Sequence, residues 1–228
     1  MKTKIITYGT SGYLEFMKNF YCNLSCLGLS ESLKIFCLDK NCYDEMKDFA
    51  DCDVISWQVD EVKTDMIEYG AAGYDLIMGA KLEIITKELE TSERILYSDS
   101  DMFFINDPMD YLDSSMRRKD LDALFMLDWN GEACAGFFYI NNSEACKELF
   151  KPERVSGQLA FDQTLINKRL QTVGAKHSML PPSCFPNGLI WRGGVSDWGG
   201  IEKFAVHYNA TSPFNKKELM QRYGHWVI

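Results

Sequence analysis

Two acidic residues separated by one position, Asp99 and Asp101, offer the clearest chemistry in the sequence. They directly follow residues 94–97, whose apolar, β-prone composition predicts a buried strand. Carboxylates two residues apart on an extended backbone point the same way, about 6 to 7 Å apart, and they repel each other unless a cation joins them. Hard divalent cations are commonly held by one or two carboxylates together with substrate phosphates. The pair therefore predicts a metal that bridges the protein to a diphosphate.

The Asp-x-Asp pattern by itself is weak, because it recurs at Asp51/Asp53 and at Asp120/Asp122. Both of those pairs precede a predicted strand, on the end of an α/β sheet that rarely binds ligands. The pair at residues 99 and 101 follows its strand and therefore lies at the end of the sheet that usually binds ligands. The alternative interpretation is a solvated turn, since aspartate is a common turn residue.

A late histidine, His207, lies in the last short apolar run, residues 204–208. A neutral imidazole is a common ligand for manganese or zinc, although a lone histidine is more often structural. Asn209 follows two residues later, and Lys216 and Lys217 come after a loop that is able to return towards phosphate oxygens. These neighbours favour a functional histidine, and nothing in the sequence separates the two lysines.

Three further polar residues fall on predicted helices. Asp162 and Gln163 lie in the predicted helix 159–170, where adjacent side chains point about 100° apart. In the functional interpretation one of them reaches the reacting group while the other binds a neighbour, and in the alternative both are surface polar groups. Lys81 lies on the predicted helix 75–90 and is open to the same two interpretations.

Strands and helices alternate around these residues. Apolar patterns predict strands at 4–8, 33–38, 53–57, 94–97, 121–127, 136–140 and 204–208, and helices at 13–27, 43–49, 75–90, 143–150 and 159–170. This order predicts an α/β protein: one Rossmann-like domain over residues 1–228, with a mixed central sheet flanked by helices. Residues 181–200, which include Trp191 and Trp198, predict a long functional loop or an irregular floor. Either tryptophan is able to stack on a substrate or to belong to the core.

The composition limits the classes of partner. The 228 residues are 46% apolar, which predicts a folded core, and their net charge of −9 argues against nonspecific binding to nucleic acid or to an anionic membrane. Neither a membrane span nor a signal peptide is predicted. The eight cysteines contain no Cys-x-x-Cys, which predicts free thiols in a reducing compartment. We therefore expect a soluble, cytoplasmic protein.

The ordered set of motifs resembles a GT-A glycosyltransferase with a DxD motif. The chain is most similar to nucleotide-diphospho-sugar transferases related to plant cell-wall transferases, and more distantly to the galactosyltransferase and glycogenin-like group. The matching segments are residues 7–10, the helix with Lys81, residues 95–103 and 135–141, Asp162-Gln163, and residues 206–209. Two departures stand out: Cys134 replaces an asparagine found in many relatives, and the segment around His207 lacks the Gly and Lys spacing of the glycogenin-like group.

The resemblance implies a role for each candidate residue. Asp99, Asp101 and His207 would bind Mn²⁺ or Mg²⁺, with Asp99 also contacting the ribose. Lys216 would contact the diphosphate. The resemblance further implies that Thr7, Tyr8 and Thr10 line the pocket for the base and ribose, and that Ser100 also contacts the donor. Lys81, Asp162 and Gln163 would surround the donor sugar and the acceptor.

The implied function is metal-dependent transfer of a sugar from a nucleoside-diphosphate donor, such as a UDP-sugar, to a hydroxyl of a glycan or glycoprotein acceptor. An inverting reaction requires a base, Asp162 or Asp128, whereas in a retaining one the departing phosphate oxygen can take the proton. By analogy with the family we expect retention. A catalytically inactive sugar- or nucleotide-binding module is the first alternative.

Two other enzyme classes fit the sequence less well. A haloacid-dehalogenase-type phosphatase also places Asp-x-Asp after a strand, but that strand usually opens the phosphatase chain. Two residues after its second aspartate such a phosphatase has Thr or Val, where this chain has Phe103. A nucleotidyltransferase of similar fold would need an arginine in its first Gly-rich loop, and residues 9–12 contain none.

Overall fold

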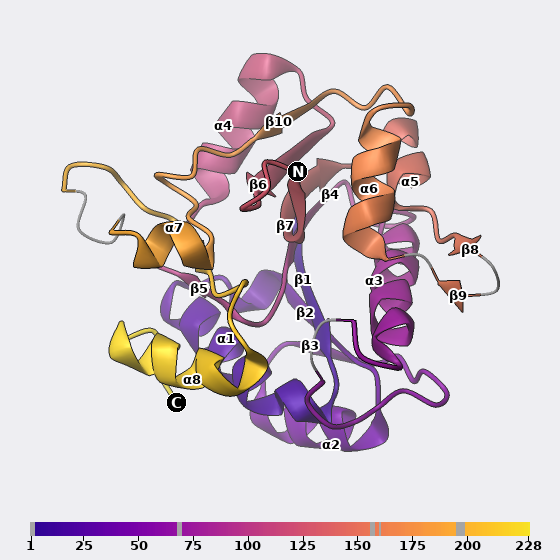
Figure 1. Ribbon diagram of the computed structural model, residues 1–228, viewed down its shortest axis with the longest axis vertical. Helices are drawn as coiled ribbons and strands as arrows, with labels where there is room; N and C mark the ends of the chain where they lie inside the picture. The colour runs from indigo at the N-terminus through magenta and orange to yellow at the C-terminus, as the bar shows by residue number, and fades with distance from the viewer. Residues whose placement is uncertain (1–2, 68–69, 156–157, 160, 195–198) are drawn as a thin grey trace.

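A mixed seven-stranded sheet forms the centre of the computed structural model, which describes residues 3–67, 70–155, 158–159, 161–194 and 199–228. Its strands are β1 Thr3–Gly9, β2 Leu33–Cys37, β3 Asp53–Ser56, β4 Arg94–Ser98, β6 Ala123–Leu127, β7 Ala133–Asn141 and β10 His177–Met179. They lie in the order β10-β6-β7-β4-β1-β2-β3 (Figure 1). β7 is antiparallel to both neighbours, and the other adjacent pairs are parallel. The predicted α/β class with a mixed sheet is confirmed.

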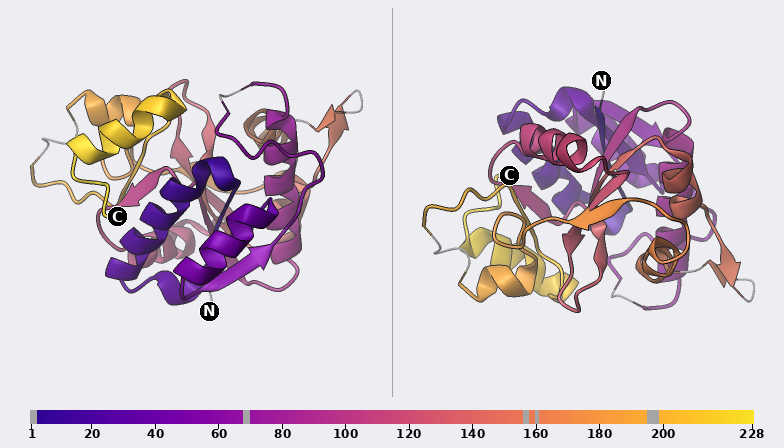
Figure 2. Two further views of the ribbon diagram at one scale, coloured as in Figure 1. Left: turned by 90° about the horizontal axis from the view of Figure 1, so that it is seen from below. Right: turned by 90° about the horizontal axis from the view of Figure 1, so that it is seen from above.

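Helices cover both faces of this sheet (Figure 2). One face packs against α1 Leu14–Cys26, α2 Lys40–Phe49 and α4 Met109–Lys119, and the other against α3 Tyr74–Glu88, α5 Glu144–Phe150 and α6 Asp162–Leu170. The helix-period spacing of Met17, Phe20 and Leu24 puts all three on the side of α1 that faces the sheet, where each is fully buried. Burial of such apolar faces fixes the ends of the strands, where the polar residues lie.

A second, two-stranded sheet pairs β5 Met102–Phe104 with β11 Ala205–His207. β5 is further held by Asn23 of α1, whose side chain exchanges hydrogen bonds of 2.9 and 2.7 Å with the backbone of Phe104. Beside this sheet lie α7 Gly188–Arg192 and α8 Pro213–Arg222, which share an apolar cluster with β11 and α1 (Figure 1). The remaining elements are the paired strands β8 Arg154–Val155 and β9 Gln158–Leu159, and the 3-10 turns η1 Ser11–Tyr13 and η2 Ser30–Ser32.

The differences from the predicted elements have local causes. The helix predicted at 159–170 begins at Asp162, because residues 158–159 pair with residues 154–155 as strands. The segment 181–200 contains the short helix α7, whose first turn is capped by the Asn187 side chain. The sequence did not predict strands β5, β8, β9 and β10 or helices α4, α7 and α8. Within the described residues, no helix combines the length and the apolar character needed to cross a membrane.

Candidate active site

Backbone pairing brings Asp99, Asp101 and His207 together from distant parts of the chain. Asp99 follows the last residue of β4, and Asp101 precedes the first residue of β5. His207 ends β11 and lies opposite Met102 of β5, while the Tyr208 amide donates to the Asp101 carbonyl at 3.1 Å. One ligand atom from each of the three side chains lies within 4.8 Å of the other two. The residues that the sequence proposed as metal ligands therefore form one cluster.

Two of the three side chains are buried, Asp99 is half-buried, and the surroundings contain both signs of charge. Asp101 is 5% exposed and His207 is 3% exposed. His207 Nε2 lies 3.2 Å from Asp101 Oδ1 and 3.8 Å from Asp99 Oδ2, while Lys216 Nζ lies 2.5 Å from Asp101 Oδ2. Burial alone would raise the pKa of the Asp101 carboxyl, but Lys216 and His207 hold that pKa well below its usual range. Asp101 is therefore a carboxylate at neutral pH.

The space around His207 requires a glycine on β7. A Cβ atom added to Gly136 would lie 2.3 Å from Cε1 of His207 and 2.7 Å from Oδ2 of Asp99, so no other residue fits without moving the cluster. The second ring nitrogen of His207, Nδ1, lies 3.5 Å from Cys134 Sγ. Because Cys134 takes that side of the ring, Nε2 is the nitrogen directed at the two carboxylates.

A buried ion pair connects helices α3 and α6 beside the cluster. Lys81 Nζ lies 2.6 Å from Asp162 Oδ2 and 3.4 Å from Asp99 Oδ1, and it donates to the Ala135 carbonyl at 3.1 Å. The ammonium also lies 4.9 Å from the ring centre of Tyr97, whose hydroxyl donates to Asp99. Burial lowers the pKa of Lys81, but the carboxylates of Asp162 and Asp99 outweigh this effect and hold it well above the ordinary value.

These positions settle the alternatives left open for two residues. Lys81 is 2% exposed and Asp162 is 4% exposed, so a solvated lysine and a surface acid are both wrong interpretations. Asp162 and Gln163 are the first two residues of α6 and do not lie in its middle. Both are therefore placed beside the first residues of β7. Their neighbours come from α3, β7 and the β6–β7 turn.

Asp128, at the start of that turn, is held by three donors. Gln163 Nε2 donates to its Oδ2 at 2.8 Å, while Asn209 Nδ2 at 3.0 Å and the Trp129 amide at 2.8 Å donate to its Oδ1. Gln163 Oε1 in turn accepts from the Ala135 amide at 3.2 Å. Asp128 is 7% exposed, so its carboxylate has a fixed direction.

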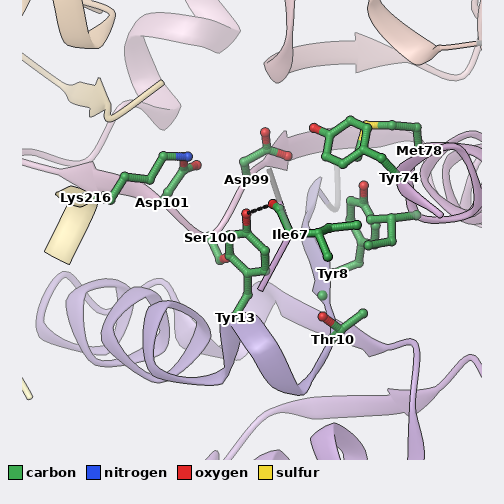
Figure 3. Close-up of a pocket in the computed structure, with 12 residues that line it drawn as sticks. Tyr8, Thr10, Tyr13, Ile67, Tyr74, Met78, Asp99, Ser100, Asp101 and Lys216 are labelled. Carbon is green, nitrogen blue, oxygen red and sulfur yellow. Dashed lines mark hydrogen bonds and ion pairs between the residues drawn. The ribbon is translucent and has the colours of Figure 1, made fainter. Parts of the chain in front are cut away.

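Two cavities meet at the Asp99–Asp101 segment. The smaller, of about 90 Å³, has aromatic and apolar walls that include Tyr8, Tyr13 and Tyr74, with Ser100 and Lys216 at the polar end (Figure 3). Thr10 also lines it, with a buried hydroxyl that has no hydrogen-bond partner among the described residues. The larger cavity, of about 550 Å³, is lined by Lys81, Asp128, Asp162, Gln163, His207 and residues of the β6–β7 turn. Thr7 is fully buried and lines neither of these two cavities.

The family model for nucleotide-diphospho-sugar transferases matches residues 29–221, which is most of the chain and includes the whole cluster. The chain belongs to this family. The resemblance proposed from the motifs is therefore confirmed. The phosphatase and nucleotidyltransferase alternatives are excluded.

Solved structures of transferases share the fold. GlyE from Streptococcus pneumoniae TIGR4 matches with a TM-score of 0.56 and 15% identity over 97% of this chain, which spans 59% of the GlyE chain. The galactosyltransferase LgtC, solved with donor and acceptor sugar analogues, has a TM-score of 0.58 and 12% identity over 99% of this chain and 96% of its own. Mouse xyloside xylosyltransferase 1 matches with a TM-score of 0.58 and 10% identity, over 93% of this chain and 99% of its own. No curated protein sequence matches the chain.

Two further residues that the sequence analysis named as possible functional residues of this transferase-family chain have other roles. Lys217 pairs with Glu15 at 2.9 Å and not with the cluster, so the structure separates it from Lys216. Trp191 is 5% exposed and packs against Tyr223, which makes it a core residue and not a stacking surface. Trp198 lies outside the described residues.

One aromatic side chain on the larger cavity escaped the sequence analysis. Trp129, in the β6–β7 turn, is 67% exposed and lines that cavity. Its signal in the sequence was a tryptophan placed directly after Asp128, in a short polar turn between two apolar strands, where no core position is expected.

Proposed function

We propose that the chain is a metal-dependent glycosyltransferase that moves a sugar from a UDP-sugar to a hydroxyl of a glycan or glycoprotein, with retention of configuration. The observation that carries this proposal is the cluster of Asp99, Asp101 and His207 at the junction of two cavities. The smaller cavity suits a nucleoside, because Tyr8, Tyr13 and Tyr74 offer apolar walls and Thr10 offers an unused hydroxyl. The larger one suits the donor sugar and the acceptor.

The donor set of the cluster fits a divalent cation. Two carboxylates and one imidazole suit Mn²⁺ better than Mg²⁺, which prefers oxygen ligands alone. Asp99 and Asp101 would supply oxygen and His207 would supply Nε2. A cation bound there supplies Lewis-acid stabilisation of the charge that develops on the departing diphosphate.

The chain's own cations complete the site. Lys216 neutralises Asp101 from 2.5 Å, and it also lines both cavities. When Asp101 takes another cation, the Lys216 ammonium is available to bind a phosphate oxygen and to stabilise the leaving group. Lys81 stays paired with Asp162 and orients that carboxylate towards the larger cavity.

The state of the two candidate bases supports retention. Asp162 is engaged by Lys81 at 2.6 Å, and Asp128 accepts three hydrogen bonds. Both carboxylates are thus already engaged by donors of the protein. The acceptor proton then goes to the departing phosphate oxygen, while Asp162, Gln163 and Asp128 position the two sugars.

Thermal denaturation with manganese and a panel of UDP-sugars tests the metal site. We expect a donor with Mn²⁺ to raise the melting temperature, because a ligand that binds only the native state stabilises it. Asp101→Ala should abolish this rise, since it removes a buried ligand. The matched control is Asp53→Ala, which alters another Asp-x-Asp whose carboxylate is exposed and 3.8 Å from Lys4. An equal rise in the Asp101→Ala protein would contradict the site.

Release of nucleoside diphosphate separates the enzyme from the inactive binding module. The enzyme is expected to release UDP from at least one donor when Mn²⁺ is present, and faster with an acceptor. The module would bind the donor and show the thermal shift without any release, because a fold and a metal site do not by themselves establish turnover.

A further inference from the structure

The β6–β7 turn places a large aromatic ring at the edge of the larger cavity. Trp129 is 67% exposed, although buried or half-buried positions are usual for so apolar a side chain. It adjoins Asp128, whose carboxylate accepts the Trp129 amide at 2.8 Å. An exposed indole beside a fixed polar group offers a flat apolar surface on which a ring-shaped ligand can stack.

Hydrogen bonds inside the turn hold this surface in place. The Asp128 amide donates to the Glu132 carbonyl at 2.8 Å, and the Gly131 amide donates to the Asp128 carbonyl at 3.1 Å. Gly131 adopts a φ of 87°, which other residue types rarely adopt. The Asn130 side chain closes the turn by donating to Glu132 Oε2 at 2.7 Å and accepting from the Glu132 amide at 3.1 Å. A ring on a rigid turn costs little entropy when it binds a ligand.

The walls near Trp129 have the chemistry of a site for hydroxyl groups. They carry amide, carboxylate and hydroxyl side chains: Asn130, Glu132, Gln163, Thr164, Asn209 and Thr211. Among the described residues, neither Asp128 nor Glu132 forms an ion pair, whereas Lys81 and Lys216 are each paired with an aspartate deeper in the site. This end of the cavity is therefore net negative and disfavours an anionic ligand.

We propose that Trp129 stacks on the apolar face of an uncharged acceptor sugar ring and is the residue that selects the acceptor. The inference rests on the proposed glycosyl transfer and names the acceptor class for it. The ring hydroxyls bind the surrounding amides and carboxylates, and the indole covers the C–H face of the sugar. The acidic walls select a neutral ring over a uronic acid.

Acceptor kinetics with Trp129 variants test this assignment. The probes are methyl glycosides of glucose, galactose and N-acetylglucosamine, with methyl glucuronide and methyl glucosaminide as the anionic and cationic arms. Using the best donor and Mn²⁺, KM is measured for donor and acceptor in the parent, Trp129→Ala, Trp129→Phe and Phe214→Ala. Phe214 is the matched control, because it is 69% exposed and lines neither of the two cavities.

We expect a neutral glycoside to be the preferred acceptor. Trp129→Ala should raise the acceptor KM about tenfold, equivalent to about 1.4 kcal/mol, and far more than it raises the donor KM. Trp129→Phe should recover most of the loss, because a smaller ring still stacks, and Phe214→Ala should match the parent. Titration of the parent with the preferred glycoside should also change tryptophan fluorescence, and the change should be missing in Trp129→Phe.

Three results would overturn the inference while leaving the transferase proposal intact. These are an unchanged acceptor KM in Trp129→Ala, a preference for the anionic or cationic arm, and a parent protein that releases UDP but accepts none of the neutral glycosides. A parent that neither binds a donor nor releases UDP would instead refute the proposed function itself.

Discussion

Lys81 is a single side chain that joins the two halves of the site. Its ammonium is 2.6 Å from Asp162 and 3.4 Å from Asp99, and it is almost completely removed from water. A buried ion pair is weak evidence for stability as such, but removing one partner leaves an uncompensated charge in a region of low dielectric constant. The loss of Lys81 therefore affects folding as well as the position of Asp162.

Substitution of Lys81 by methionine tests this account. Lys81→Met should lower the free energy of unfolding by about 3 kcal/mol, because it strands the Asp162 carboxylate, and urea denaturation measures the change. The double variant Lys81→Met/Asp162→Asn should recover part of the loss, since its buried amide carries no charge. Lys87→Met, on the exposed side of the same helix, breaks only a surface pair with Glu90 and should lower the stability much less than Lys81→Met does. Equal losses at positions 81 and 87 would contradict the buried-charge account.

How far residues are predictable from sequence depends on what defines their role. Asp99, Asp101 and His207 were recognisable because their side-chain types and their places at strand ends are local properties. The pairing of Lys81 with Asp162, and the three donors around Asp128, depend on contacts between α3, α6 and the β6–β7 turn. No spacing along the chain encodes these contacts, so the sequence left a solvated lysine and a surface acid open.

At the scale of elements, β7 passes closer to the cluster of Asp99, Asp101 and His207 than a residue with a side chain would allow. The absence of a Cβ at Gly136 lets the strand backbone pass beside His207 and Asp99. Gly136→Ala should therefore displace both side chains and weaken the proposed Mn²⁺ binding by at least about tenfold, since small misplacements of a site are costly. Calorimetric titration with Mn²⁺ measures this loss.

The matched control for Gly136 is another glycine with open space around it. Gly199→Ala meets nothing within 4 Å of the added Cβ, and Gly199 has no left-handed backbone. It should bind Mn²⁺ like the parent. Parent-like affinity in a folded Gly136→Ala protein would show that His207 and Asp99 do not need this close approach.

Elements with a strong apolar period were the ones that the sequence located correctly. Six of the seven strands of the central sheet and helices α1, α3 and α5 bury a regular set of apolar residues, so their patterns indicated them directly. The seventh strand, β10, is only partly buried and was not predicted. In α4 only Leu112, Ser115 and Met116 are buried, and its pattern resembles a polar loop. Strand β5 has three residues and is defined by its partner β11 and by Asn23. Such elements exist because of tertiary contacts, which a short sequence window does not contain.

At the scale of the whole molecule, the segment after α8 returns to the centre of the fold. His225 is 9% exposed, its ring stacks on Phe103 at a centroid distance of 4.2 Å, and its Nδ1 is 2.7 Å from the Tyr208 hydroxyl. The Asn19 side chain of α1 donates to the His225 carbonyl at 3.1 Å. These contacts connect the C-terminal segment to α1 and to the second sheet.

Burial lowers the pKa of His225 from 6.5 to about 4, which makes the stability of the fold depend on pH. Between these two values the unfolded chain binds a proton that the folded chain does not. The stability contributed by neutral His225 is therefore complete above pH 6.5 and declines as the pH falls towards 4. From pH 7.5 to pH 5 the expected loss from this residue is about 2 kcal/mol.

Urea denaturation at pH 7.5 and at pH 5 measures this loss. His225→Gln keeps an acceptor for the Tyr208 hydroxyl but cannot titrate, so it should lose about 2 kcal/mol less than the parent over the interval. His177→Gln, which makes the same replacement at an exposed histidine, is the matched control. If the free energy of unfolding changed equally with pH in the parent and in His225→Gln, the attribution of this change to His225 would be wrong.

The pairing of β5 with β11 has a consequence for variation among related chains. Three residues from each strand take part, and their register helps to place His207 beside Asp101. Sliding one strand by a single residue would turn the imidazole to the opposite side of the ribbon. An insertion or deletion of one residue within either short strand would therefore separate the histidine from the acids.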